Sequence, residues 1–200
     1  MIRRVLALVL VVALGGCVRT RTVEFQVAAP EVQSNASWTQ SVDVSVVVAD
    51  LRSDQLKLGK SYVRGVGGGT GEYSVQTSKN MDAAIKQGIE AEFRSRGVSR
   101  FEGPAKLLVN VSKAEGTTWV APWNVDVDAD ANLAAKVIGA DGAVLYERTF
   151  RRREPGKGEV WTMDTVEQGA YHLQRVMASV IRDMVDDERL VLALVKASRR

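Results

Sequence analysis

The most regular pattern in the chain lies in residues 125–139, where apolar and polar positions alternate. This alternation is typical of a strand with one face on a core and the other in water. The Asp141–Gly142 dipeptide favours a two-residue hairpin turn after it, with residues 143–152 as the return strand. The predicted inner face comprises Val125, Val127, Ala129, Ala131, Leu133, Ala135 and Val137, and the outer face comprises Asp126, Asp128, Asp130, Asn132 and Lys136.

A two-residue turn would fix the register of this hairpin by pairing Ala140 with Ala143. Both faces then become complementary, because opposite charges meet on one side and apolar side chains on the other. Arg148 is the exception, since it falls on the apolar face without an evident reason. The predicted cross-strand pairs are Lys136–Glu147, Asn132–Arg151, Asp130–Arg153, Val137–Tyr146 and Leu133–Phe150.

Four further strands are predicted from shorter patterns. Valines at alternate positions indicate a strand over residues 41–50, and a similar pattern covers 106–112. Short strands are predicted over 60–64 and 72–76. They flank the glycine-rich run Gly65–Gly71, which we expect to be a loop between strands.

A first helix is predicted over residues 79–96, because its apolar residues recur at helical spacing. Ser78 or Asn80 is expected to cap its start. Gly97 stands where a left-handed residue closes a helix. The apolar stripe comprises Ile85, Ile89 and Phe93.

A second helix is predicted to begin near Met163, where Asp164 and Glu167 resemble a capping box. Residues 188–197 are strongly apolar with charged ends, and they are expected to form a final helix or strand on the body. The core stripe of the second helix comprises Val166, Ala170, Leu173, Met177, Val180 and Met184.

The order of these elements indicates an α/β domain of the α+β type. We expect a two-layer sandwich in which a mixed, mostly antiparallel sheet carries two main helices on one face. The strands over 41–50 and 106–112 enclose the first helix, which favours a right-handed parallel crossover between them.

Residues 1–16 have the layout of a signal peptide that is cleaved during export. Arg3 and Arg4 form a positive start, and an unbroken apolar stretch covers Val5–Leu14. This stretch is too short to span a bilayer, which needs about 20 apolar residues.

The end of this segment, Leu14-Gly15-Gly16-Cys17, resembles a lipobox, the processing site of bacterial lipoproteins. The resemblance implies that the Cys17 thiol is joined to diacylglycerol, that the chain is cut before Cys17, and that the new amine is acylated, with palmitate among the acyl groups. Two or more acyl chains hold a protein stably on a membrane.

The expected organisation is a lipidated Cys17 with a tether over residues 17–37, followed by one periplasmic domain over 38–200. Val18 stands where an Asp would retain a lipoprotein in the inner membrane of enteric bacteria. Because residue 18 is valine rather than aspartate, the sequence favours a periplasm-facing position on the outer membrane.

Composition excludes several function classes. Without Arg3 and Arg4, 25 basic residues face 24 acidic ones, so the mature chain is close to neutral. A nucleic-acid binder normally carries a clustered basic face, and no nucleic-acid partner is predicted. The single cysteine excludes an internal disulfide.

No catalytic, metal or cofactor site is predicted. Gly65–Gly71 does not lead into the Gly-Lys-Ser/Thr and helix of a phosphate loop. Asp126–Asn132 resembles the opening of a calcium loop, but Ala131 and Val137 occupy the positions that need glycine and an acidic residue. His172 is expected at an exposed helix position, which gives no support to a catalytic triad.

Trp119 and Trp123 are the candidate partner contacts. They lie in Thr117–Trp123, which we expect to be a loop, and exposed tryptophans tend to have a function. The two rings either cover the domain's own core or touch a protein partner or a membrane. Self-packing is the favoured interpretation.

The body resembles the YajG-type family of uncharacterised bacterial lipoproteins over residues 41–190. The resemblance rests on Ala49-Asp50-Leu51-Arg52, Leu58-Gly59, a helix closed by Gly97, alternating strands and a last long helix. It implies an envelope location and carries over no chemistry. We expect a non-catalytic accessory or binding domain for an envelope protein complex, with a periplasmic lipid or small-ligand carrier as the alternative.

Overall fold

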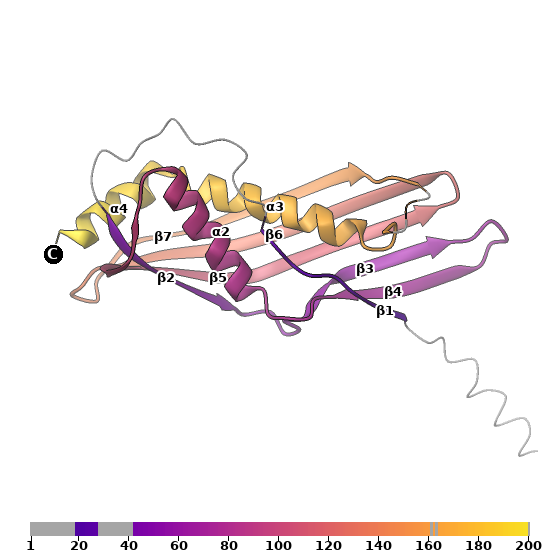
Figure 1. Cartoon of the computed structure of the whole chain (residues 1–200), viewed down its shortest axis with the longest axis horizontal. Helices are drawn as coiled ribbons and strands as arrows, with labels where there is room; N and C mark the ends of the chain where they lie inside the picture. Colours follow the sequence, from indigo (N-terminus) through magenta and orange to yellow (C-terminus); the bar gives the residue numbers. More distant parts are fainter. Residues whose placement is uncertain (1–18, 28–41, 161, 163, 200) are drawn as a thin grey trace, which may run out of the picture.

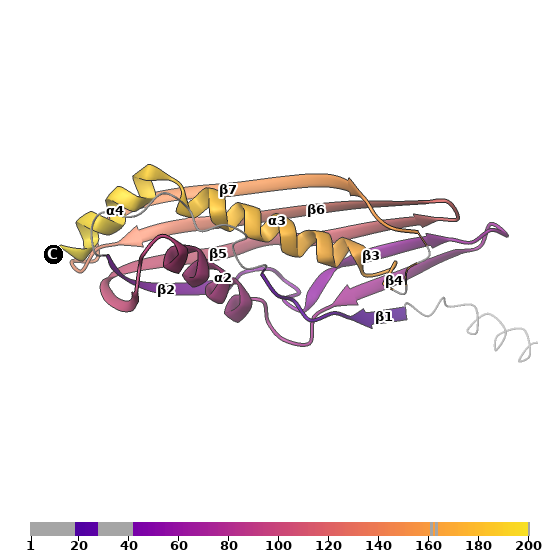
Figure 2. The ribbon, with the colours of Figure 1, turned by 45° about the horizontal axis from the view of Figure 1, so that its top comes forward.

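The computed structural model describes residues 19–27, 42–160, 162 and 164–199. Leu14, Gly15, Gly16 and Cys17 lie outside the described residues. The predicted two-layer α+β architecture is confirmed, with one seven-stranded mixed sheet and helices on one face (Figures 1 and 2). The strands are β1 (Arg19–Thr22), β2 (Asp43–Asp50), β3 (Lys57–Arg64), β4 (Thr70–Gln76), β5 (Arg100–Ala121), β6 (Asn124–Ile138) and β7 (Val144–Lys157); the helices are α2 (Asp82–Ser95), α3 (Gln168–Val185) and α4 (Glu188–Ser198).

The sheet runs in the order β1-β4-β3-β5-β6-β7, and β2 also pairs with β5. β5 is 22 residues long, so β2 pairs with its first half and β3 with its second. The predicted parallel pairing of 41–50 with the strand after the first helix is confirmed. The pairs β3–β4, β5–β6 and β6–β7 are antiparallel.

The β6–β7 hairpin has the predicted register. All five predicted pairs form, from Asp130 opposite Arg153 to Val137 opposite Tyr146. The turn itself differs, because a bulge beyond Val137 pairs Ile138 with Val144. The Gly139 amide then donates to the Ala143 carbonyl, so the connection is longer than a two-residue turn.

The predicted loop at Thr117–Trp123 is wrong, because most of it continues β5. A bulge at Ser112 shifts the pairing with β6 between Val111 and Lys113. Before the bulge, odd-numbered residues of β5 face the helices, and after it the even-numbered Ala114, Gly116 and Thr118 do. Such a bulge inserts one residue and breaks the alternation by which a strand is recognised.

The motif Ala49–Arg52 joins β2 to β3. The Asp50 carboxylate pairs with the Arg52 guanidinium at 2.6 Å, and both side chains are almost completely buried. Arg52 Nη1 also donates to the carbonyls of Lys57 and Ala114, at 2.6 and 3.0 Å. These bonds hold the end of β2, the start of β3 and the middle of β5 together, so the motif is structural.

All three segments predicted as helical contain a helix, but α3 begins at Gln168 rather than near Met163, and the N-terminal caps of α2 and α3 differ from the predicted ones. Neither Ser78 nor Asn80 caps α2, whose N-cap residue is the buried Met81. The Asp164–Glu167 capping box also fails to form, since α3 starts only after Glu167. At the other end of α2, Gly97 has a φ of 96° and the Val98 amide donates to the Phe93 carbonyl, as predicted.

Part of the expected tether belongs to the fold. β1 pairs in parallel with β4, and the following residues run between α2 and α3 (Figure 1). Val23 and Phe25 are buried in the common core, although residues 23–27 form no regular strand. Short, mixed segments such as this one lack a periodic signal, and only tertiary contacts give them a structure.

Arg148 reaches Asp187, which explains its position on the apolar face. Its guanidinium lies over the Phe150 ring, 5.1 Å from the centroid, and donates to the Asp187 carboxylate. The Tyr146 hydroxyl donates to the same carboxylate at 3.0 Å. Asp187 also caps α4, because it accepts from the Arg189 amide at 2.8 Å. One carboxylate therefore fastens α4 to β7.

The pKa of Asp187 is lowered. Burial raises it, but the hydrogen bonds from Tyr146, Arg148 and the amides of α4 outweigh burial. Burial and the Asp187 charge together raise the pKa of Tyr146. Because the folded-state pKa of Asp187 lies below its unfolded value of about 3.9, its stabilising effect is present above that pH and is lost as the pH falls.

We expect Asp187→Ala to lower the free energy of unfolding by about 2 kcal/mol at neutral pH, since it removes a cap and leaves Tyr146 unpaired. Asp187→Asn keeps a capping oxygen, so its free energy of unfolding should fall less than that of Asp187→Ala. Because it has no carboxylate to protonate, its stability should also fall less than that of the wild type when the pH drops below about 4. Urea unfolding across this pH range measures both effects. Equal acid sensitivity in the wild type and Asp187→Asn would contradict this role.

Candidate interaction surface

Exposed apolar side chains gather at one end of the sheet, where the β3–β4 and β5–β6 hairpins turn. We call this region the hairpin end and define it by Tyr62, Val66, Trp119 and Trp123. Val66 and Trp123 are each 81% exposed, whereas Tyr62 and Trp119 are close to 40%. The other large exposed apolar residues lie outside this end, at Val47 on β2, Leu51 and Leu56 in the connection from β2 to β3, Val144 on β7, Tyr171 on α3 and Leu192 on α4.

The two candidate tryptophans occupy different positions at this end. Trp119 lies on β5 beside Tyr62 of β3, and the two rings stack with centroids 6.5 Å apart. Trp123 stands in the turn between β5 and β6. The favoured self-packing therefore applies in part to Trp119, which is still 43% exposed, whereas Trp123 is mostly exposed.

The helix side of the hairpin end is hollowed into an apolar recess of about 440 Å³. It lies between the ends of β3 and β5 and the connection that leads into α3. Most of its wall is formed by apolar side chains, among them Val63, Val66, Val120, Pro122, Val160 and Val166. Apolar surface thus lines both sides of this end. Of the four residues that define the hairpin end, Tyr62 and Val66 are the two that the sequence patterns did not identify as candidate contacts.

The face of the sheet opposite the helices carries a ladder of cross-strand ion pairs. Asp130 Oδ2 accepts from Lys113 at 2.8 Å and from Arg151 at 3.3 Å. Arg153 pairs with Asp128, and Lys157 with Asp126. The aspartates are thus paired with cations on the face away from the helices, where Asp130 itself is only 7% exposed. The described residues contain no group of three or more acidic, histidine or cysteine side chains that could hold a metal.

The predicted exposure of His172 is wrong, because the residue is only 7% exposed. Its Nε2 lies 2.8 Å from the Glu154 carbonyl, and its Nδ1 lies 3.1 Å from Nη2 of Arg175. The ring therefore ties α3 to β7, the ordinary role of a buried histidine with both nitrogens satisfied.

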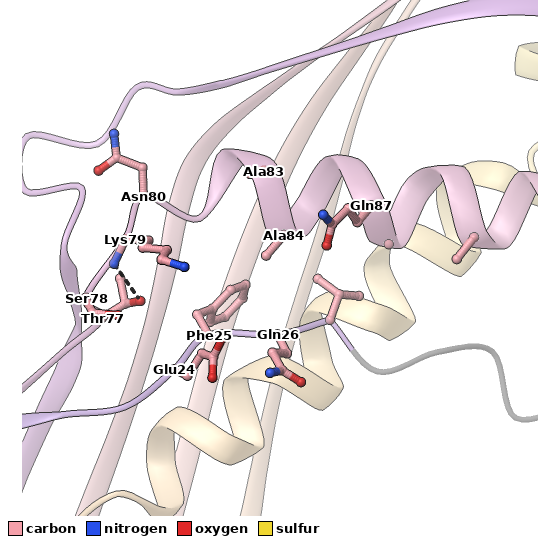
Figure 3. A pocket seen from close by; sticks show the side chains of 13 residues that line it. Glu24, Phe25, Gln26, Thr77, Ser78, Lys79, Asn80, Ala83, Ala84 and Gln87 are labelled. Atoms are coloured by element: carbon pink, nitrogen blue, oxygen red, sulfur yellow. Dashed lines mark hydrogen bonds between the residues drawn. The ribbon is translucent and has the colours of Figure 1, made fainter.

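A second hollow, of about 590 Å³, lies between the N-terminal segment and α2 (Figure 3). Phe25 points into the space between α2 and α3. Lys79, just before α2, and Gln87, on α2, lie at the wall opposite the N-terminal segment. The Val23 amide donates to the Gln76 carbonyl at 2.8 Å, and Gln174 Nε2 donates to the Glu24 carbonyl at 2.9 Å. The chain's own segment thus occupies part of the groove that a lipid carrier would use, and the hollow remains between it and α2.

The remaining wall of this hollow suits a lipid poorly. Sites for apolar ligands are lined mostly by apolar side chains. Here Phe25, Val27 and three alanines share the wall with seven polar residues, namely Glu24, Gln26, Thr77, Ser78, Lys79, Asn80 and Gln87. The carrier interpretation gains no support from this geometry.

We expect Phe25→Ala to release residues 19–27 from the body and to cost about 3 kcal/mol, because the ring is only 5% exposed. Gln26→Ala is the matched control, because Gln26 is the next residue in the chain and its side chain is exposed. Hydrogen exchange of the β1 and β4 amides measures the release. Unchanged protection in Phe25→Ala would contradict the packing of this segment.

No helix in the described parts of the chain is long and apolar enough to cross a membrane. A family model described as "Uncharacterized lipoprotein" matches residues 29–194. The chain belongs to this lipoprotein family. The predicted resemblance to YajG-type lipoproteins is thereby confirmed, since this family accounts for most of the chain.

Two solved structures are similar to this chain to different degrees. Protein XCC0632 from Xanthomonas campestris, of the family DUF330, has a TM-score of 0.58 at 15% identity, covering 90% of this chain and 99% of its own. A minor lipoprotein from Acinetobacter baumannii has a TM-score of 0.41 at 11% identity, covering 78% of this chain and 94% of its own. At such identities the first likeness shows a shared fold alone. The comparison with curated proteins found no match.

Proposed function

We propose that this lipoprotein is anchored through lipid on Cys17 to the outer membrane, faces the periplasm, and serves as a non-catalytic accessory domain of an envelope protein complex. The observation that carries the proposal is the start of β1 at Arg19. Only Val18 separates Cys17 from this strand, which is hydrogen-bonded within the sheet. The lipid and the folded body are therefore joined almost directly.

A direct connection favours a docked subunit over a shuttle. A carrier that moves ligands between membranes needs a long tether or release from the membrane. This body is confined beside its anchor, because two residues span at most about 7 Å. Confinement raises the effective concentration of the body toward a neighbouring membrane complex, which favours stable docking.

The open face of the sheet is the surface that we assign to the protein partner. Within the described residues, no helix covers it (Figure 2). Its ion-pair ladder presents paired charges across β5, β6 and β7. Charged faces of this kind select partners by electrostatic complementarity.

Crosslinking in intact cells followed by capture of the tagged protein tests this function. We expect one dominant envelope complex with the wild type and its loss with Cys17→Ala. Arg153→Glu, on the open face, should also lose the partner, whereas Arg94→Glu, on α2, should keep it. The two variants are matched, because each reverses the charge of one exposed arginine that is paired with one carboxylate. Capture of lipid without any enriched protein would support a carrier and contradict the accessory role.

A further inference from the structure

The hairpin end lies on the side of the molecule from which the anchored chain emerges. A single row of paired residues crosses the sheet from Arg19 through Tyr73 and Ser61 to Thr118. Beyond this row toward the hairpin turns lie all four residues of the hairpin end. Figures 1 and 2 both show β1 beginning in the half of the molecule where the β3–β4 hairpin turns, away from the end that carries α4, with the hairpin projecting beyond it.

The short connection limits how far the hairpin end can stand from the bilayer. Arg19 pairs with Tyr73, and β4 begins three residues farther toward the turn, at Thr70. At about 3.3 Å per residue, β4 therefore extends about 10 Å past Arg19, and the loop with Val66 projects farther. Cys17 lies at most about 7 Å from Arg19. A lipid on Cys17 thus places the hairpin end at the level of the membrane surface.

The side chains at this end suit that surface. Tryptophan and tyrosine rings favour the boundary between headgroups and acyl chains, where Trp119, Trp123 and Tyr62 would lie. The glycines around Val66 present little bulk, and a Cβ added at Gly67 or Gly69 would meet nothing within 4 Å. Arg64 is exposed at the same end and forms no ion pair within the described residues, so it can attract anionic headgroups.

We propose that the hairpin end is a membrane-contact surface that inserts into the interface of the bilayer holding Cys17. The inference rests on the proposed lipid anchor and adds a second, weaker attachment beside it. Two attachments at one end fix the direction of the long sheet. The open face and the α4 end then project from the membrane toward the partner.

Labelling at single introduced cysteines tests this contact, because Cys17 is the chain's own cysteine and is consumed by lipid. The full-length lipoprotein is prepared as Val66→Cys, Trp123→Cys and, as a control at the far end, Leu192→Cys, whose wild-type side chain is 67% exposed. Each carries an environment-sensitive fluorophore. The proteins are reconstituted into vesicles of phosphatidylethanolamine and phosphatidylglycerol containing lipids with doxyl groups near the top of the acyl chain.

We expect the doxyl lipids to quench most of the fluorescence at positions 66 and 123 and little at 192, with the opposite order for aqueous iodide. Iodide quenching at all three positions, in protein that floats with the vesicles, would overturn the membrane contact and leave the anchor intact. Failure to float would overturn both the anchor and the contact. Protection from iodide only in native membranes, without doxyl quenching, would assign the hairpin end to a protein and also overturn the proposal.

Discussion

Cys17→Ala is expected to leave the chain uncut and free of palmitate, and to abolish the proposed lipid attachment to the outer membrane. In the proposed processing, the thiol sulfur takes the diacylglycerol, and the cut before residue 17 follows that step. Each buried CH₂ of an acyl chain contributes about 0.8 kcal/mol, so loss of all acyl chains removes the dominant membrane affinity. Labelling with radioactive palmitate and fractionation of the envelope measure the effect.

Gly15→Ala is the matched control for this change, because alanine is also small and should leave the processing site usable. It should incorporate palmitate like the wild type. Normal palmitate incorporation in Cys17→Ala would contradict the lipid site at residue 17.

Gly116→Ala is expected to have the largest effect on folding. A Cβ at Gly116 would lie 2.1 Å from the Gly169 carbonyl oxygen, which belongs to the first turn of α3. A Cβ at Gly59 of β3 would in turn lie 1.6 Å from the Gly116 carbonyl oxygen. Three backbones thus approach one another at glycines, and only a shift of β5 against α3 could make room for a methyl group.

Such a backbone clash should cost about 3 kcal/mol or prevent folding, since overpacking of a close contact is relieved only by moving whole elements. Gly67→Ala is the control, because a Cβ there meets nothing within 4 Å. Urea unfolding of the full chain in detergent measures the difference. A stability within error of the wild type would contradict the close packing of α3 on β5.

The parts of the fold that could be predicted are those in which one pattern runs without interruption. The β6–β7 register follows from Asp130, Asn132 and Lys136 facing basic or acidic partners, and all these pairs form. The core stripe of α3 follows equally directly from its spacing, with Leu173, Met177 and Met184 fully buried.

The missed features depend on contacts between segments that are distant in sequence. The bulge at Ser112 hides the second half of β5, because it exchanges the inner and outer faces at one residue. β1 gains its structure only by pairing with β4, more than fifty residues later. His172 looked exposed from helical spacing alone, whereas β7 passes over it and supplies the Glu154 carbonyl.

The candidate surface was partly accessible from the sequence. Trp119 and Trp123 stand out by residue type, and Gly65–Gly71 stands out by composition. Their common location does not follow from either signal, since it depends on β3 pairing with the second half of β5. The position of Arg19 in the same sheet adds the relation to the anchor, which no local pattern contains.

Intact-mass spectrometry of the protein extracted from the membrane tests the central claim most directly. The account predicts a chain that begins at Cys17 and carries the added mass of a diacylglycerol and an acyl group. A chain that begins at Met1, or one cut elsewhere without added lipid, would contradict the direct connection between the lipid and β1.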